Sequence, residues 1–142
     1  MRMREIKLMA SLLLLFSLAI PVPFTSAAAG NVKIKVTLVS MELTENNHVG
    51  NEWYTAGYIN GKEIAEGSSM VLDLKTTESV KLKAYAEEQD KIPDSAEASV
   101  SILASAVTKT ISKAVKVTVT ENRGRYSGNT ATWKFTFKVE KQ

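Results

Sequence analysis

The sequence predicts an all-β protein, a single antiparallel β-sandwich of about eight strands that follows an N-terminal leader. Apolar and polar residues alternate with period two through much of the chain after residue 30. Turn-forming residues, among them Asn60-Gly61 and Gly67-Ser68, separate the alternating segments. The composition is 44% hydrophobic and 23% charged, which is typical of a globular domain and not of a disordered chain.

The leader has the three parts of a secretory signal peptide. Three basic residues lie within the first seven, an apolar run extends from Leu8 to Ile20, and small residues end the segment at Ala29. The run of about 13 residues is shorter than the ~20 that a transmembrane helix needs. We therefore expect cleavage after Ala29, with Ala27 and Ala28 as alternatives, and a secreted, extracellular protein with no transmembrane segment. Residues 1–29 form the signal peptide and residues 30–142 the β-sandwich domain.

The charge and composition after cleavage exclude several classes of function. Three basic residues and one acidic residue leave with the leader, so 15 Lys+Arg and 14 Asp+Glu remain of 18 and 15. Such a neutral chain has no general electrostatic affinity for nucleic acid. The absence of cysteine excludes disulfides, cysteine-ligated metals and thiol nucleophiles, and the single histidine, His48, excludes sites built from two histidines.

Four segments alternate most clearly and predict strands with one face on a core. In residues 32–38, 80–87, 115–120 and 133–139, lysine or threonine alternates with apolar residues. We expect the apolar side chains to be buried: Val32, Ile34, Val36, Leu38, Val80, Leu82, Val115, Val117, Val119, Trp133, Phe135 and Phe137. We expect the lysines on the other face to be exposed: Lys33, Lys35, Lys81, Lys83, Lys116, Lys134 and Lys138.

Turn residues place the remaining strands. Asn60-Gly61 predicts a type I′ hairpin between residues 53–59 and 62–65, because both central residues of that turn need positive φ. The eight expected strands are 32–42, 53–59, 62–65, 69–74, 80–87, 97–103, 114–121 and 130–139. Residues 104–113 are rich in Ser and Thr and predict a loop or at most one helical turn. An eight-stranded barrel is the alternative arrangement.

Three long polar connections are expected to lie together. Residues 43–52, 88–96 and 122–129 form the first, fifth and seventh connections of the predicted chain. If every strand crosses the sandwich and reverses direction, odd-numbered connections emerge at one end. Loops gathered at one end of a rigid sandwich often carry binding sites. The arrangement requires the short strand 62–65 to cross the domain.

Acidic side chains on these connections suggest a calcium site. Carboxylate and amide oxygens are the ligands that calcium prefers, and the connections supply Glu45, Asn47, Glu52, Glu88, Asp90 and Asp94. The acidic segment Glu87–Asp94 resembles a loop of C2-type β-sandwich domains, which bind calcium at one end. The resemblance implies a C2-like or immunoglobulin-like sandwich with a calcium cofactor. The alternative for these carboxylates is a solvated acidic turn.

The connection after the seventh strand offers a second kind of ligand contact. Arg123, Arg125 and Tyr126 could bind phosphate, carboxylate or a sugar acid, or the arginines could neutralise the loop carboxylates. Trp53, Tyr54, Tyr58 and Trp133 are interpreted as packing residues, with a sugar platform as the alternative.

The sequence gives little support for catalysis. No nucleophile-elbow motif accompanies His48. We therefore expect a secreted, non-enzymatic binding module with an extracellular protein or a cell-surface ligand as partner. The alternative is a small secreted hydrolase that uses loop carboxylates or His48.

Overall fold

The computed structural model describes residues 30–142, so the predicted signal peptide lies outside the described residues. The strands are β1 (Asn31–Asn46), β2 (Trp53–Ile59), β3 (Lys62–Ile64), β4 (Ser69–Lys75), β5 (Ser79–Glu88), β6 (Asp94–Leu103), β7 (Ile111–Thr120) and β8 (Thr130–Lys141). Two short 3-10 turns, η1 (Ala104–Ala106) and η2 (Gly124–Tyr126), lie in connections. The described domain, residues 30–142, is therefore all-β, as predicted.

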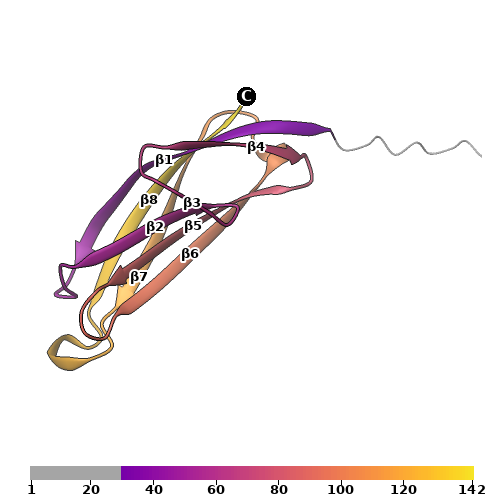
Figure 1. Cartoon of the computed structure of the whole chain (residues 1–142). Coiled ribbons are helices and arrows are strands. Elements are labelled where there is room, and N and C mark those ends of the chain that lie inside the picture. Colours follow the sequence, from indigo (N-terminus) through magenta and orange to yellow (C-terminus); the bar gives the residue numbers. More distant parts are fainter. Residues whose placement is uncertain (1–29) are drawn as a thin grey trace, which may run out of the picture.

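The strands form two separate four-stranded antiparallel sheets that pack face to face (Figure 1). Sheet A has the order β4-β1-β8-β7, and sheet B has the order β3-β2-β5-β6. The β-sandwich is confirmed, and the alternative of a closed barrel is wrong. No helix within residues 30–142 has the length and apolar character needed to cross a membrane.

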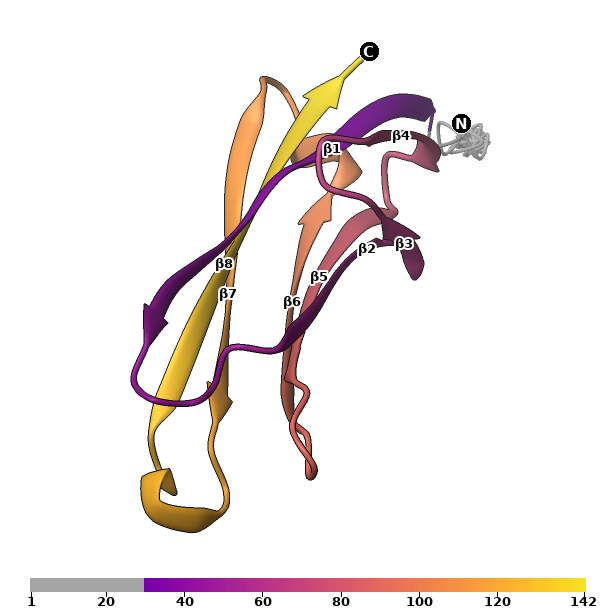
Figure 2. The ribbon, with the colours of Figure 1, turned by 60° about the vertical axis from the view of Figure 1, so that its left-hand side comes forward.

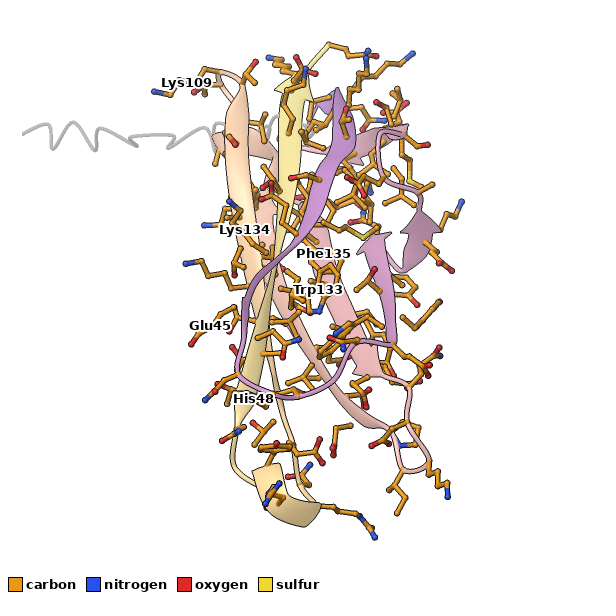
Figure 3. All side chains as sticks on the ribbon, turned by 90° about the vertical axis from the view of Figure 1, so that its left-hand side faces the viewer. Glu45, His48, Lys109, Trp133, Lys134 and Phe135 are labelled. Carbon is orange, nitrogen blue, oxygen red and sulfur yellow. The ribbon has the colours of Figure 1, made fainter. Side chains whose placement is uncertain are left out.

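The core lies between the sheets. It contains the apolar side chains that the alternating pattern predicted to be buried, with one exception. Of the predicted core residues, all but Trp133 are buried, and Phe135 and Phe137 are its largest fully buried side chains. Trp133 is only half-buried, and its indole ring meets Trp53 edge to face at 5.8 Å. Figure 3 shows Trp133 and Phe135 between the sheets and Lys134 pointing away from them.

The lysines lie on the solvent faces, although not all of them are fully exposed. Lys33, Lys81 and Lys116 are exposed. The other four are half-exposed: Lys35, Lys83, Lys134 and Lys138. Three of them, Lys83, Lys134 and Lys138, form ion pairs with glutamates on the same faces.

Several strand ends differ from the prediction. β1 continues to Asn46 because register shifts next to Val39 and Thr44 keep it paired with β8 past each irregularity. β5 and β6 pair as far as Glu88 opposite Asp94, which shortens the predicted loop 88–96 to residues 89–93. Residues 104–113 contain a single 3-10 turn, as expected, and β7 then begins earlier than predicted, at Ile111.

The predicted hairpin at Asn60-Gly61 is confirmed. Asn60 has a φ of 47° and Gly61 a φ of 80°, and Ile59 pairs with Lys62 across the turn. The positive φ at both positions is what a type I′ turn needs. β3 therefore runs antiparallel to β2 and preserves the alternation of strand direction along the chain. The expectation that it crosses the domain is wrong, because β3 has three residues and pairs only with Gly57–Ile59.

This alternation brings the three long connections to one end of the sandwich. The β1–β2, β5–β6 and β7–β8 connections, residues 47–52, 89–93 and 121–129, lie together at the lower end in Figure 2. We call this end the loop end. The predicted grouping of the first, fifth and seventh connections is therefore confirmed.

Candidate functional site

The three connections of the loop end touch one another. The Asn47 amide donates a hydrogen bond to the Thr130 carbonyl at 3.0 Å, which joins the β1–β2 connection to the start of β8. The His48 and Tyr126 rings stack with centroids 5.2 Å apart and planes 15° from parallel. The Gln89 amide donates to the Glu52 carbonyl at 2.6 Å. Segments from three separate parts of the sequence therefore form one surface.

The β1–β2 connection is held in shape by Asn46. Its side-chain amide donates to the Gly50 carbonyl at 2.7 Å, and its side-chain oxygen accepts a hydrogen bond from the Val49 amide at 3.0 Å. Val49 is buried, which anchors the loop on the core. His48 sits between these points in the left-handed region, with φ of 57°. Non-glycine residues seldom adopt this conformation. In it, the His48 imidazole stacks on the Tyr126 ring.

The loop end is hollowed beside the stacked rings. The hollow has a volume of about 330 Å³ and is lined by Asn46, His48, Gly50, Asn51 and Tyr126. Tyr126 is 43% exposed, so one side of the stack remains open to solvent. Two amides and two aromatic rings offer both hydrogen bonds and a flat apolar surface to a ligand.

At the loop end of sheet B, behind the hollow, three paired residues face inward, and two of them are acidic. Trp53 pairs with Glu88, and Glu88 pairs with Asp94, so the three side chains cross the sheet side by side. Glu88 and Asp94 are 4% and 7% exposed, and they are the buried polar residues of the described domain. Both were expected on the loop 88–96, as calcium ligands or, in the alternative, in a solvated acidic turn. They are buried because strand pairing extends to the last residue of β5, Glu88, and the first residue of β6, Asp94, and both face inward.

Both carboxylate oxygens of Asp94 accept hydrogen bonds from Asn122. The Asn122 side-chain amide donates to Asp94 Oδ1 at 2.7 Å, and the Asn122 backbone amide is 3.2 Å from Asp94 Oδ2. The contact joins the β7–β8 connection to the start of β6. It spans 28 residues, which is why local sequence patterns did not indicate Asn122.

Glu88 is less completely satisfied. Its Oε2 atom is buried and has no hydrogen-bond partner within residues 30–142. Burial raises the pKa of Glu88 above its ordinary value, and the nearby carboxylates of Asp90, Glu121 and Glu52 raise it further. The carboxyl group packs against Gly50, where any Cβ would overlap it. Glu88 therefore lies beneath the hollow, between all three connections.

The other predicted metal ligands do not converge on Glu88 in the structure. Glu45 lies on β1 opposite Thr132 and faces outward from sheet A, whereas Glu88 faces inward from sheet B (Figure 3). Asn47, Glu52 and Asp90 are exposed, and the Asp90 side chain accepts a hydrogen bond from the Ile92 amide at 2.7 Å. Within residues 30–142, no three acidic or histidine side chains form a group arranged to hold a metal ion.

The arginine side chains of the β7–β8 connection point to no internal neutralisation of the loop carboxylates. Arg123 and Arg125 are exposed, and neither forms an ion pair in the part of the chain that the structure describes. Neutralisation of the loop carboxylates by these arginines, one of the sequence-based alternatives, is therefore not what the structure shows. Glu121, which the sequence did not indicate, adds to the negative charge near Glu88.

Comparison with protein-family models and with curated proteins finds no match to this chain. The functional argument therefore depends on the geometry of the loop end itself.

Proposed function

We propose that this protein is an exported, non-enzymatic binding module whose ligand site is the loop end. The observation that carries the proposal is the meeting of three distant connections around Glu88 and the His48–Tyr126 stack. Connections that only link strands have no need of the strained His48 backbone or of a buried carboxylate. Both features cost stability, and such costs are typical of binding sites.

The proposal includes a calcium ion near Glu88. The uncompensated negative charge of Glu88, Asp90, Glu121 and Glu52 favours a cation, and Glu88 Oε2 is an oxygen without a partner. Calcium takes six to eight oxygen ligands in flexible geometry. Asp90 and Glu52 are exposed, so their side chains can turn toward Glu88 when the ion binds. Backbone carbonyls of the connections and water would complete the shell.

The hollow beside His48 and Tyr126 would bind the extracellular partner. Arg123 and Arg125, on the same connection as Tyr126, are placed to add charged contacts to an anionic group of that partner. His48 is expected to act through its stacked ring, because its Nδ1 lies 3.3 Å from the Asn47 side-chain oxygen and not near a carboxylate. Among residues 30–142, the hydrogen-bond partner of the His48 ring is the Asn47 side-chain amide and not a carboxylate, which favours a binding role over the hydrolase alternative.

A thermal melt in calcium and in chelator tests the metal site. A ligand at 100 times its Kd adds about 2.7 kcal/mol to the free energy of unfolding. For a domain of this size, the Tm rises by on the order of 10 °C. Glu88→Gln and Asp90→Asn should each reduce the shift, while Asp73→Asn, which removes an exposed carboxylate on β4, should retain it. Identical melts of the unmodified protein in calcium and chelator would contradict the proposed site.

Export is tested separately. Expression with the complete leader should release a protein whose first residue is Gly30, as read by N-terminal sequencing of the culture medium. Retention of residues 1–29 on a cell-associated protein would contradict the proposal that the module is secreted.

A further inference from the structure

The outward face of sheet B carries a cluster of tyrosines that the core does not use. Tyr54 and Tyr58 lie on β2 on either side of Ala56, and Tyr85 pairs with Ala56 from β5. Ala56 is only 2% exposed although it faces away from the core, because these rings surround it. Tyr54 is 41% exposed and meets Tyr85 edge to face at 6.1 Å. We call these three residues the tyrosine cluster.

Carboxylates border the tyrosine cluster. Glu63 on β3 pairs with Tyr58, and Glu97 on β6 pairs with Tyr85. The Tyr85 hydroxyl donates to Glu87 Oε2 at 2.6 Å, and this bond raises the pKa of Tyr85. The Glu63 carboxylate raises the pKa of Tyr54. Three glutamates therefore surround the rings.

The protein's own Lys83 shows how this surface takes up a cation. Its Nζ lies 4.5 Å from the centroid of the Tyr58 ring and 3.6 Å from Glu97 Oε2. A ring face and a carboxylate together are a favourable site for an ammonium group. Lys83 compensates one glutamate. Within residues 30–142, neither Glu63 nor Glu87 forms an ion pair, so the half of the cluster around Tyr54 has the same groups without a cation.

We propose that the outward face of sheet B binds a cationic peptide segment, whose lysine or arginine side chains lie on Tyr54 between Glu63 and Glu87. Charge complementarity favours this partner over a neutral glycan, because a glycan would leave the negative charge of both glutamates uncompensated. The surface lies on the side of a sheet and not at the loop end. The inference therefore does not depend on the calcium site or on the hollow.

The test measures binding of a short oligolysine peptide to the protein at low ionic strength by fluorescence anisotropy. Tyr54→Ala should raise the Kd about two- to fivefold, which is the range for one exposed cation–π contact. Tyr54→Phe retains the ring and should leave the Kd nearly unchanged. The double variant Glu63→Gln, Glu87→Gln should weaken binding further and reduce its dependence on salt.

Matched variants locate the binding surface. Tyr126→Ala removes a tyrosine of similar exposure at the loop end, and Asp73→Asn removes a carboxylate from sheet A. Both should leave the oligolysine Kd unchanged. Equal weakening by Tyr126→Ala would place the peptide at the loop end and overturn the proposal. Circular dichroism and a melt for each variant separate loss of the surface from loss of the fold.

Two further outcomes would also overturn the proposal that sheet B binds a cationic peptide. The first is binding of oligoglutamate as tightly as oligolysine. The second is binding of a neutral oligosaccharide that depends on Tyr54 while oligolysine fails to bind, because the face would then be a sugar platform.

Discussion

Glu88 places a carboxyl group at an inward position at the end of β5. It continues the inward series Val80, Leu82, Ala84 and Ala86 along β5, where an apolar side chain would be expected. Its carboxyl group is buried, and Oε2 has no partner. The position follows from strict alternation, so the pattern of β5 indicated the direction of the side chain. The sequence did not show that strand pairing would continue far enough to bury it.

The raised pKa of Glu88 predicts a stability that falls as the pH rises. Below the ordinary value of 4.5, the carboxyl is protonated in both the folded and the unfolded chain. Between that value and the higher pKa of the folded state, the unfolded chain releases its proton first, so the free energy of unfolding decreases with pH. Above the folded-state pKa, the penalty is constant.

Glu88→Gln should remove this decline, when urea unfolding is measured in chelator across the acidic range up to neutral pH. The matched control, Asp73→Asn, removes an exposed carboxylate of β4 and should retain the wild-type decline. A Glu88→Gln profile parallel to that of the wild type would show that Glu88 is not the group responsible.

Asn122 is predicted to stabilise the fold through Asp94. Asn122→Ala removes the 2.7 Å hydrogen bond and leaves a buried carboxylate oxygen without a donor. The cost should be about 1–3 kcal/mol in urea unfolding. Arg123→Ala, at the next position, removes an exposed side chain and should change stability by no more than about 0.5 kcal/mol. Equal stabilities of the two variants would contradict the assigned role of Asn122.

At the scale of elements, the hairpin at Asn60-Gly61 shows what turn chemistry can and cannot predict. The Asn-Gly pair correctly indicated the turn and the direction of β3. It did not indicate that the Asn60 side chain also accepts a hydrogen bond from the Lys81 amide at 2.6 Å, which ties the turn to β5. That contact reaches across 21 residues, beyond the range of a local pattern.

Both turn residues should therefore contribute to stability. Gly61→Val should cost on the order of 1–2 kcal/mol, because a β-branched residue is forced to a φ of 80°. Asn60→Gly keeps the turn conformation but loses the bond to β5, at a cost of about 1 kcal/mol. Chemical denaturation measures both. A neutral Gly61→Val would mean that the positive φ is not required.

The ends of the strands were the least predictable part of each element. Nothing in residues 38–46 indicates the two register shifts that carry β1 onward beside β8. As a result, Glu45 was expected on a loop, whereas it lies on the outer face of sheet A. The same error applied to Glu88 and Asp94, which pair within sheet B and, unlike Glu45, are buried.

At the scale of the molecule, the order of strand directions was enough to group the three connections. The first, fifth and seventh connections share one end because the long strands that flank them alternate in direction and extend to that end. The three-residue β3 does not cross the domain, and the third connection is hydrogen-bonded to Leu38 in the middle of β1. The contacts within that group could not be predicted, because they join side chains such as His48 and Tyr126, far apart in the sequence. The architecture therefore follows from periodicity and turns, whereas the chemistry of the loop end depends on tertiary contacts.

The central proposal is that these three connections together form one calcium-binding site. The most direct measurement follows the backbone amide resonances of the protein as calcium is added to a calcium-free sample. The account predicts shifts concentrated in residues 47–52, 88–94 and 121–126, with little change around the turn at Asn60-Gly61 at the opposite end. A spectrum that does not change, or changes confined to the opposite end, would contradict it.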